Sequence, residues 1–254
     1  MRLHSTGGSA EQQSTAMPPQ ATTRSRSVAL PVPMAPAPLC ALVSLVFASV
    51  YDLANSLTSA RGAIARGVFD WERSIPFVEW TIVPYLSICV FFAWSFFIDH
   101  DRDQQARHVV RLLLALALSV ACYAAFPLRF MFERPSTTGA IGLMFDLLSA
   151  VDLPYNRAPS LHISVLVILW ARFAPRLAGW RRVGLQLWFA SIALSVLTTY
   201  QHHVIDVPAG LLVGWLCVAL TTRTPGAAYS GCTPASWIAL RLRSMSRARK
   251  SRKA

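Results

Sequence analysis

The stretch TTYQHHVIDVPAG, residues 198–210, places two histidines and an aspartate at the junction of two long apolar runs. Imidazole and carboxylate groups are costly there if the runs cross a bilayer, because the hydrocarbon holds no water to solvate them. Polar side chains at membrane depth are therefore candidates for a functional site. Whether this stretch is such a site depends on the rest of the chain.

The composition of the chain is typical of a membrane protein. Of its 254 residues, 54% are hydrophobic and 14% charged, whereas ordinary globular proteins have about 25% charged residues. The net charge of +12 does not indicate binding to nucleic acid, because the basic residues lie in short loops and after residue 222 without a finger or helix-turn-helix pattern. The five cysteines form no close pair, so we predict neither a redox motif nor a metal site.

Three regions follow from the distribution of apolar residues. Residues 1–35 are rich in Ser, Thr, Gln and Pro and predict a disordered cytoplasmic tail. Residues 36–222 alternate apolar stretches with short polar loops. Residues 223–254 form a basic cytoplasmic tail that either lies on an anionic membrane surface or is solvated.

Six stretches in the middle region have about the length that a bilayer demands. The first is the weakest, because Asp52 and Asn55 lie near its end. We therefore expect an all-α integral membrane protein, a six-span helical bundle. The expected spans are residues 38–57, 77–98, 109–127, 160–177, 181–200 and 203–222.

The arginines and lysines set the expected orientation. With the N-terminus in the cytoplasm, the inside segments hold 18 basic residues and the outside segments six. Because positive charge is enriched in cytoplasmic loops, both termini are predicted inside. The excess of arginine over lysine suggests a bacterial chain, and hence the cytoplasmic (inner) membrane.

This topology places three polar segments on the outer side. LRFMFERP (128–135) follows the third span, APSLH (158–162) opens the fourth, and QHHVID (201–206) opens the sixth. We therefore expect the three segments to converge at one level of the membrane and to form one site.

The spacing of His202 and Asp206 predicts a hydrogen-bonded pair, because residues four apart share one face if a helix starts near 202. The carboxylate would accept one imidazole N–H and leave the other nitrogen as a base or nucleophile. His203 has the less favourable spacing to Asp206, and we expect a structural role for it. The alternative for the pair is a helix cap with no chemistry.

The other two segments supply groups that bind phosphate. Ser160 and His162 follow Pro159, a favoured residue in the first helical turn, and helix N-termini bind phosphate oxygens through free N–H groups. Arg129 and Arg134 can add charge and bidentate contacts. Together these residues favour phosphoryl transfer, with no metal and no cofactor predicted.

The motifs ERP (133–135), PSLH (159–162) and HHVID (202–206) resemble the three signatures of the type-2 phosphatidic acid phosphatase superfamily. The segment FDWERSIPFVEWTIVPYLS (69–87) is similar to the branch that holds the inositol phosphorylceramide synthases. It also resembles the membrane half of bacterial proteins fused to a dual-specificity phosphatase domain. The resemblance covers about residues 45–220.

The resemblance implies a role for each matched residue. His202 would be the nucleophile that becomes phosphohistidine, Asp206 would orient it, and His162 would protonate the leaving oxygen. Arg134 and Ser160 would hold the substrate phosphate.

Two positions depart from the signatures of the superfamily. Pro127 stands where the first motif has a lysine, and Val196 stands where the third has an arginine. Arg129 and Arg157 are near enough in the sequence to replace the missing cations. Fewer cations favour a phosphodiester head group over a phosphate dianion.

The function predicted is an integral membrane lipid phosphatase that cleaves a lipid phosphate or a head-group phosphoester. The substrate would be a phospholipid or an isoprenoid phosphate in the bilayer, with no nucleic-acid partner and no oligomeric state predicted. One alternative is a head-group transferase like an inositolphosphotransferase. The other is a non-catalytic membrane scaffold or lipid transporter of the same fold.

Three aromatic residues, Trp71 before the second span and Trp80 and Tyr85 near its start, are predicted to form an interfacial belt before any role with substrate.

Overall fold

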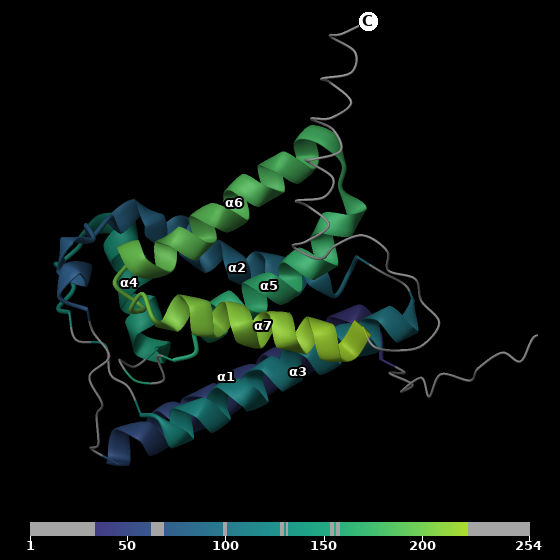
Figure 1. Ribbon diagram of the computed structural model, residues 1–254, viewed down its shortest axis with the longest axis horizontal. Helices are drawn as coiled ribbons and strands as arrows, with labels where there is room; N and C mark the ends of the chain where they lie inside the picture. Colours follow the sequence, from purple (N-terminus) through teal and green to yellow (C-terminus); the bar gives the residue numbers. More distant parts are fainter. Residues whose placement is uncertain are drawn as a thin grey trace, which may run out of the picture.

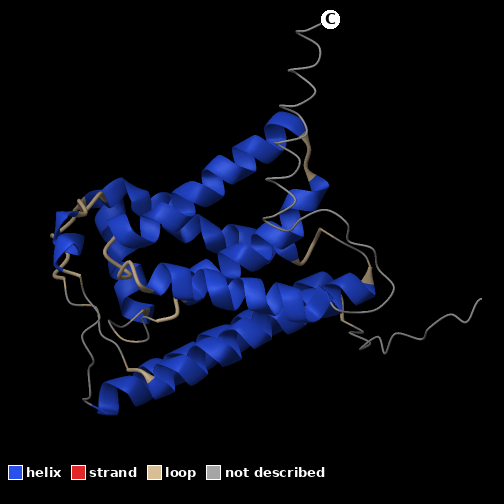
Figure 2. Cartoon of the chain, in the orientation of Figure 1, coloured by secondary structure: helices blue, strands red, loops and turns tan. Residues whose placement is uncertain are grey.

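The computed structural model describes residues 34–61, 69–98, 101–127, 130, 132–152, 155 and 158–222. Over these residues the chain is helical, with no strand (Figure 2). The α-helices are α1 (Pro36–Arg61), α2 (Ile82–Ser95), α3 (Arg102–Ala125), α4 (Gly139–Val151), α5 (Leu161–Phe173), α6 (Gly179–Thr198) and α7 (Asp206–Thr222). Three short 3-10 helices are η1 (Asp70–Ser74), η2 (Glu79–Thr81) and η3 (Ala174–Arg176). The prediction of an all-α fold is confirmed.

Each of the six predicted spans overlaps one α-helix, and α4 is an additional α-helix that was not predicted. Its apolar run is only 13 residues long and contains Asp146, so it does not have the pattern of a span. Two helices, α1 and α3, are long and apolar enough to cross a membrane. The first predicted span was the weakest by sequence, yet it corresponds to one of these two helices.

The helices form a bundle with α5 and α7 at its centre (Figure 1). Helices α3 and α1 pack along one side of this pair, and α2 and α6 along the other. Helix α4 lies at the end of the bundle where α6 ends and α7 begins (Figure 1). The segments that precede α5 and α7 therefore lie at the same end of the bundle.

Apolar side chains fill the interior of the bundle and also cover its outside. Ile82, Leu112 and Ile168 are fully buried between helices. By contrast, Leu45 and Leu187 are 64% and 68% exposed on the outer faces of α1 and α6. An apolar exterior is unfavourable in water and favourable in hydrocarbon, so the surface agrees with the membrane association that α1 and α3 suggest.

The central helices approach each other closely through two glycines of α7. A Cβ at Gly210 would lie 2.5 Å from the carbonyl oxygen of Ser160, and one at Gly214 would lie 2.7 Å from that of Ser164. Small residues at helix interfaces permit such close packing in membrane proteins. The contact brings the start of α7 against the start of α5.

Gly214→Ala is expected to destabilise the fold by about 1–3 kcal/mol, because the new methyl group has no room against α5. Gly184 of α6 is the matched control, since a Cβ there meets nothing within 4 Å. Gly184→Ala should leave stability unchanged or raise it slightly, because alanine is the better helix former. Thermal unfolding in detergent measures both variants, and equal melting temperatures would contradict the close packing of α5 and α7.

Candidate active site

The loop between α6 and α7 is held by backbone hydrogen bonds to a single carbonyl. The N–H groups of Gln201 and His202 donate to the carbonyl oxygen of Val196 at 3.2 and 3.0 Å, and Tyr200 takes a left-handed conformation at φ 55°. Helix α7 then starts at Asp206, so the expectation of a helix start near residue 202 is wrong. His202 lies in the loop, and this turn rather than a shared helix face directs it toward Asp206.

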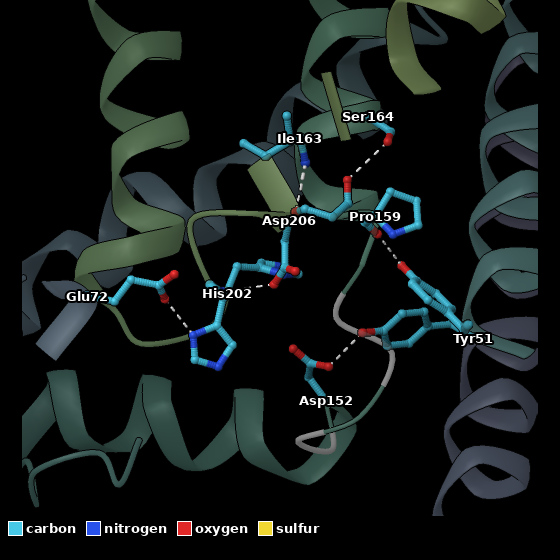
Figure 3. A network of polar contacts seen from close by, with 11 residues as sticks. Tyr51, Glu72, Asp152, Pro159, Ile163, Ser164, His202 and Asp206 are labelled. Atoms are coloured by element: carbon cyan, nitrogen blue, oxygen red, sulfur yellow. Dashed lines mark hydrogen bonds and ion pairs between the residues drawn. The ribbon is translucent and has the colours of Figure 1, made fainter. Parts of the chain in front are cut away.

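His202 and Asp206 form a buried pair in this loop. The Nδ1 atom of His202 lies 3.2 Å from Oδ2 of Asp206, and the two side chains are 5% and 1% exposed (Figure 3). The same carboxylate oxygen accepts the backbone N–H of His203 at 2.9 Å. Because an ionised carboxylate only accepts hydrogen bonds, the pair places the proton on Nδ1 and leaves a lone pair on Nε2. That nitrogen is the one available for nucleophilic attack.

The PSLH segment packs directly on this pair. The N–H of Ser160 donates to the carbonyl oxygen of Asp206 at 3.1 Å, and the hydroxyl of Tyr123 donates to the carbonyl of Pro159 at 2.9 Å. The Oγ atom of the fully buried Ser160 caps α5 by accepting the N–H of Ile163 at 3.3 Å. The Ser160 hydroxyl is therefore used to cap the helix. The backbone N–H groups at the start of α5 are the ones suited to bind an anion.

His162 stands in the first turn of α5 beside the pair. Its Nε2 atom is buried and has no hydrogen-bond partner among the residues that the structure describes. Its ring stacks on Tyr85 of α2, with ring centroids 4.2 Å apart and an interplanar angle of 18°. His162 lies two residues after Ser160, whose N–H donates to the carbonyl of Asp206. An unpartnered nitrogen next to the pair is suited to exchange a proton with a bound substrate.

The stacking on His162 corrects one prediction. Tyr85 is only 5% exposed, so it does not belong to an interfacial belt. Trp71 and Trp80 are 57% and 62% exposed and do lie on the surface.

Arg134 reaches the same loop from the segment before α4. Its Nη1 atom donates to Ser149 at 3.2 Å, and its guanidinium lies over the ring of Phe145 at 4.7 Å. Its Nη2 atom is 2.6 Å from the side chain of Gln201, the residue before His202. The three predicted segments therefore meet, with Arg134, Ser160 and His202 on one end of the bundle.

The two arginines that were predicted to replace the missing motif lysine and arginine are not part of this description. Arg129 and Arg157 lie outside the described residues. Val196, at the position of the motif arginine, is fully buried and contributes its carbonyl to the loop.

One carboxylate of the site, that of Glu72, was not predicted from the sequence. Glu72 of η1 lies 2.7 Å from Nδ1 of His203, and both side chains are at most 4% exposed (Figure 3). The ring of His203 also stacks on Phe130, at a centroid distance of 4.5 Å. This contact anchors the loop to the segment before α2, which agrees with the structural role expected of His203. Because Glu72 and His203 are 131 residues apart, no spacing rule links them.

Comparisons with models of protein families, with curated proteins and with solved structures find no match for this chain. Within the described part of the chain, no group of three or more His, Cys, Asp or Glu side chains is arranged to hold a metal ion. The interpretation of the site therefore rests on its motifs and its geometry.

Proposed function

We propose that the chain is an integral membrane lipid phosphatase that works through a phosphohistidine intermediate. The observation that carries the proposal is the buried His202–Asp206 pair, which leaves Nε2 of His202 as a nucleophile beside His162. The bond from Ser160 to Asp206 supports it further, because it joins the pair to the start of α5.

In the first step, Nε2 of His202 attacks phosphorus and forms an N–P bond while the P–O bond to the lipid breaks. His162, in its protonated form, gives its proton to the departing oxygen. Arg134 and the N–H groups at the start of α5 stabilise the charge on the phosphoryl oxygens. Asp206 stabilises the positive charge that develops on the imidazole of His202.

In the second step, a water molecule attacks phosphorus and the N–P bond breaks. His162, now neutral, takes a proton from the water and returns to its starting state. An alcohol in place of water would make the same site a head-group transferase. The buried Val196 at the position of a motif arginine favours a singly charged phosphodiester as substrate, which suits either acceptor.

We also propose that the chain spans the bacterial inner membrane six times, with both termini in the cytoplasm and the site outside. The bias of basic residues supports this orientation. The loop before α7 and the segment before α5 lie at the same end of the bundle (Figure 1). This arrangement is consistent with a site on one side of the membrane.

The test is cleavage of lipid phosphates by the purified full chain in detergent, with a chelator present. We expect phosphate or a phosphorylated head group to be released from at least one member of a panel of phospholipids and isoprenoid phosphates. Sealed right-side-out vesicles should cleave a short-chain, impermeant substrate added from outside, and inverted vesicles should need detergent. Activity that the chelator abolishes and Mg²⁺ restores would contradict the mechanism, and cleavage only by inverted vesicles would contradict the orientation.

A further inference from the structure

A chain of polar contacts leads from the peripheral helix α1 to the candidate site. The hydroxyl of Tyr51 in α1 donates to Oδ1 of Asp152 at 2.7 Å (Figure 3). The other oxygen of Asp152 lies 3.2 Å from the amide of Gln201, whose opposite atom lies 2.6 Å from Arg134. The contacts thus link four residues from separate segments, and Asp152 and Arg134 meet at Gln201.

The neighbours of Gln201 determine how its amide is oriented. Because the carboxylate of Asp152 only accepts hydrogen bonds and the guanidinium of Arg134 only donates them, the amide nitrogen faces Asp152 and the amide oxygen faces Arg134. The side chain is 1% exposed, so water does not compete for either contact. A carboxylate that accepts from the amide nitrogen also polarises the amide and makes its oxygen a stronger acceptor for Arg134.

Gln201 also belongs to the loop that carries the nucleophile. Its backbone N–H shares the carbonyl of Val196 with the N–H of His202. Because Gln201 and His202 share this turn, the contact with Gln201 also fixes the position of Arg134 relative to His202. Ser149 accepts a hydrogen bond from Nη1 of the same guanidinium, and Phe145 lies against its face. The contact of Gln201 with Nη2 adds to these and helps to orient the group.

We propose that Gln201 is a positioning residue that holds the Arg134 guanidinium where it binds the phosphate oxygens of the substrate. Asp152 and Tyr51 act through Gln201 by fixing its amide. The proposal rests on the proposed function, because it assumes that Arg134 binds the phosphate that His202 attacks.

The test measures phosphate affinity rather than turnover. The full chain in detergent is titrated with inorganic phosphate, and the rise in melting temperature gives an apparent dissociation constant. Gln201→Leu should weaken phosphate binding by about 10- to 100-fold, the range for loss of a hydrogen bond to a charged group. Arg134→Ala should weaken it by a similar factor.

The double variant distinguishes positioning from an independent contribution. If Gln201 acts through Arg134, combining Gln201→Leu with Arg134→Ala should weaken binding little more than Arg134→Ala alone. Tyr51→Phe, three contacts away from Arg134, should weaken phosphate binding only a few-fold. Gln201→Asn, which keeps the amide but is too short to bridge both neighbours, is the second variant if Gln201→Leu does not fold.

Gln105→Leu is the matched control, because Gln105 is also a buried glutamine and donates to the carbonyl of Phe96 at 3.3 Å, near the start of α3. It should leave phosphate affinity unchanged. Phosphate affinity that survives Gln201→Leu, losses that multiply in the double variant, or a wild-type chain that does not bind phosphate would each overturn the positioning role. A wild-type chain that binds phosphate through Gln201 and Arg134 but cleaves no lipid phosphate would contradict the proposed function alone.

Discussion

His202→Ala is expected to abolish turnover of every phosphate substrate, with a loss on the order of 10⁴–10⁶-fold, the range for removal of a catalytic nucleophile or its partner. The reason is that, in the proposed mechanism, the N–P bond of the intermediate forms on Nε2 of His202, which the variant lacks. The next imidazole along the chain, His203, is held by Glu72 and stacked on Phe130. The loss should therefore be independent of the leaving group.

Two measurements check this prediction. Steady-state turnover is compared with wild type, and the phosphoenzyme is trapped from a phosphorus-labelled substrate. Wild type should carry a label that acid releases and alkali does not, as expected of phosphohistidine, and His202→Ala should carry none. His108→Ala is the control, because His108 is a buried histidine near the start of α3, whereas the site lies beside the end of that helix. A His202→Ala protein that still turns over would mean that the pair is only a helix cap.

The parts of the fold that sequence predicts best are those with a local signal. An apolar stretch of membrane length predicts α6 to within two residues at each end, because length and hydropathy are properties of the segment itself. Helix α4 lacks that length, and α7 starts only at Asp206 because the preceding residues form a turn in which Gln201 and His202 donate to the carbonyl of Val196. Such boundaries depend on a few side-chain contacts that periodicity does not contain.

The candidate site shows the same contrast between features with a local sequence signal and features that depend on distant contacts. The spacing of four residues predicts that His202 and Asp206 meet, and they do, although a turn rather than a helix face brings them together. The chemical role of each stays a prediction. Glu72, Gln201 and Tyr85 could not be found in this way, because their partners come from other helices and loops. These neighbours are brought together by the packing of η1 and the segments flanking α4 against the loop before α7, and by the packing of α2 against α5.

The second large effect concerns His162, and it depends on the substrate. A lipid alkoxide leaves poorly without a proton, so His162→Ala should lower its turnover by about 10²–10⁴-fold, the usual contribution of a general acid. A phenolic phosphate with an activated leaving group needs little protonation, so the same variant should lose much less on that substrate. The position of His162 supports this role, because its buried Nε2 lacks a hydrogen-bond partner among the described residues and its ring is held by Tyr85.

The ratio of the two losses is the informative quantity, because it separates His162 from His202 within one set of measurements. For His162→Ala the loss on the lipid phosphate should exceed that on the phenolic phosphate by at least tenfold, whereas for His202→Ala the two losses should be equal. The ratio also reports on the natural substrate. A lipid diphosphate expels phosphate, a better leaving group than an alkoxide, so His162→Ala should lower its turnover less than that of a lipid monophosphate. Equal losses on both substrates for His162→Ala would contradict its role as the acid, since a residue that only shapes the site slows both reactions alike.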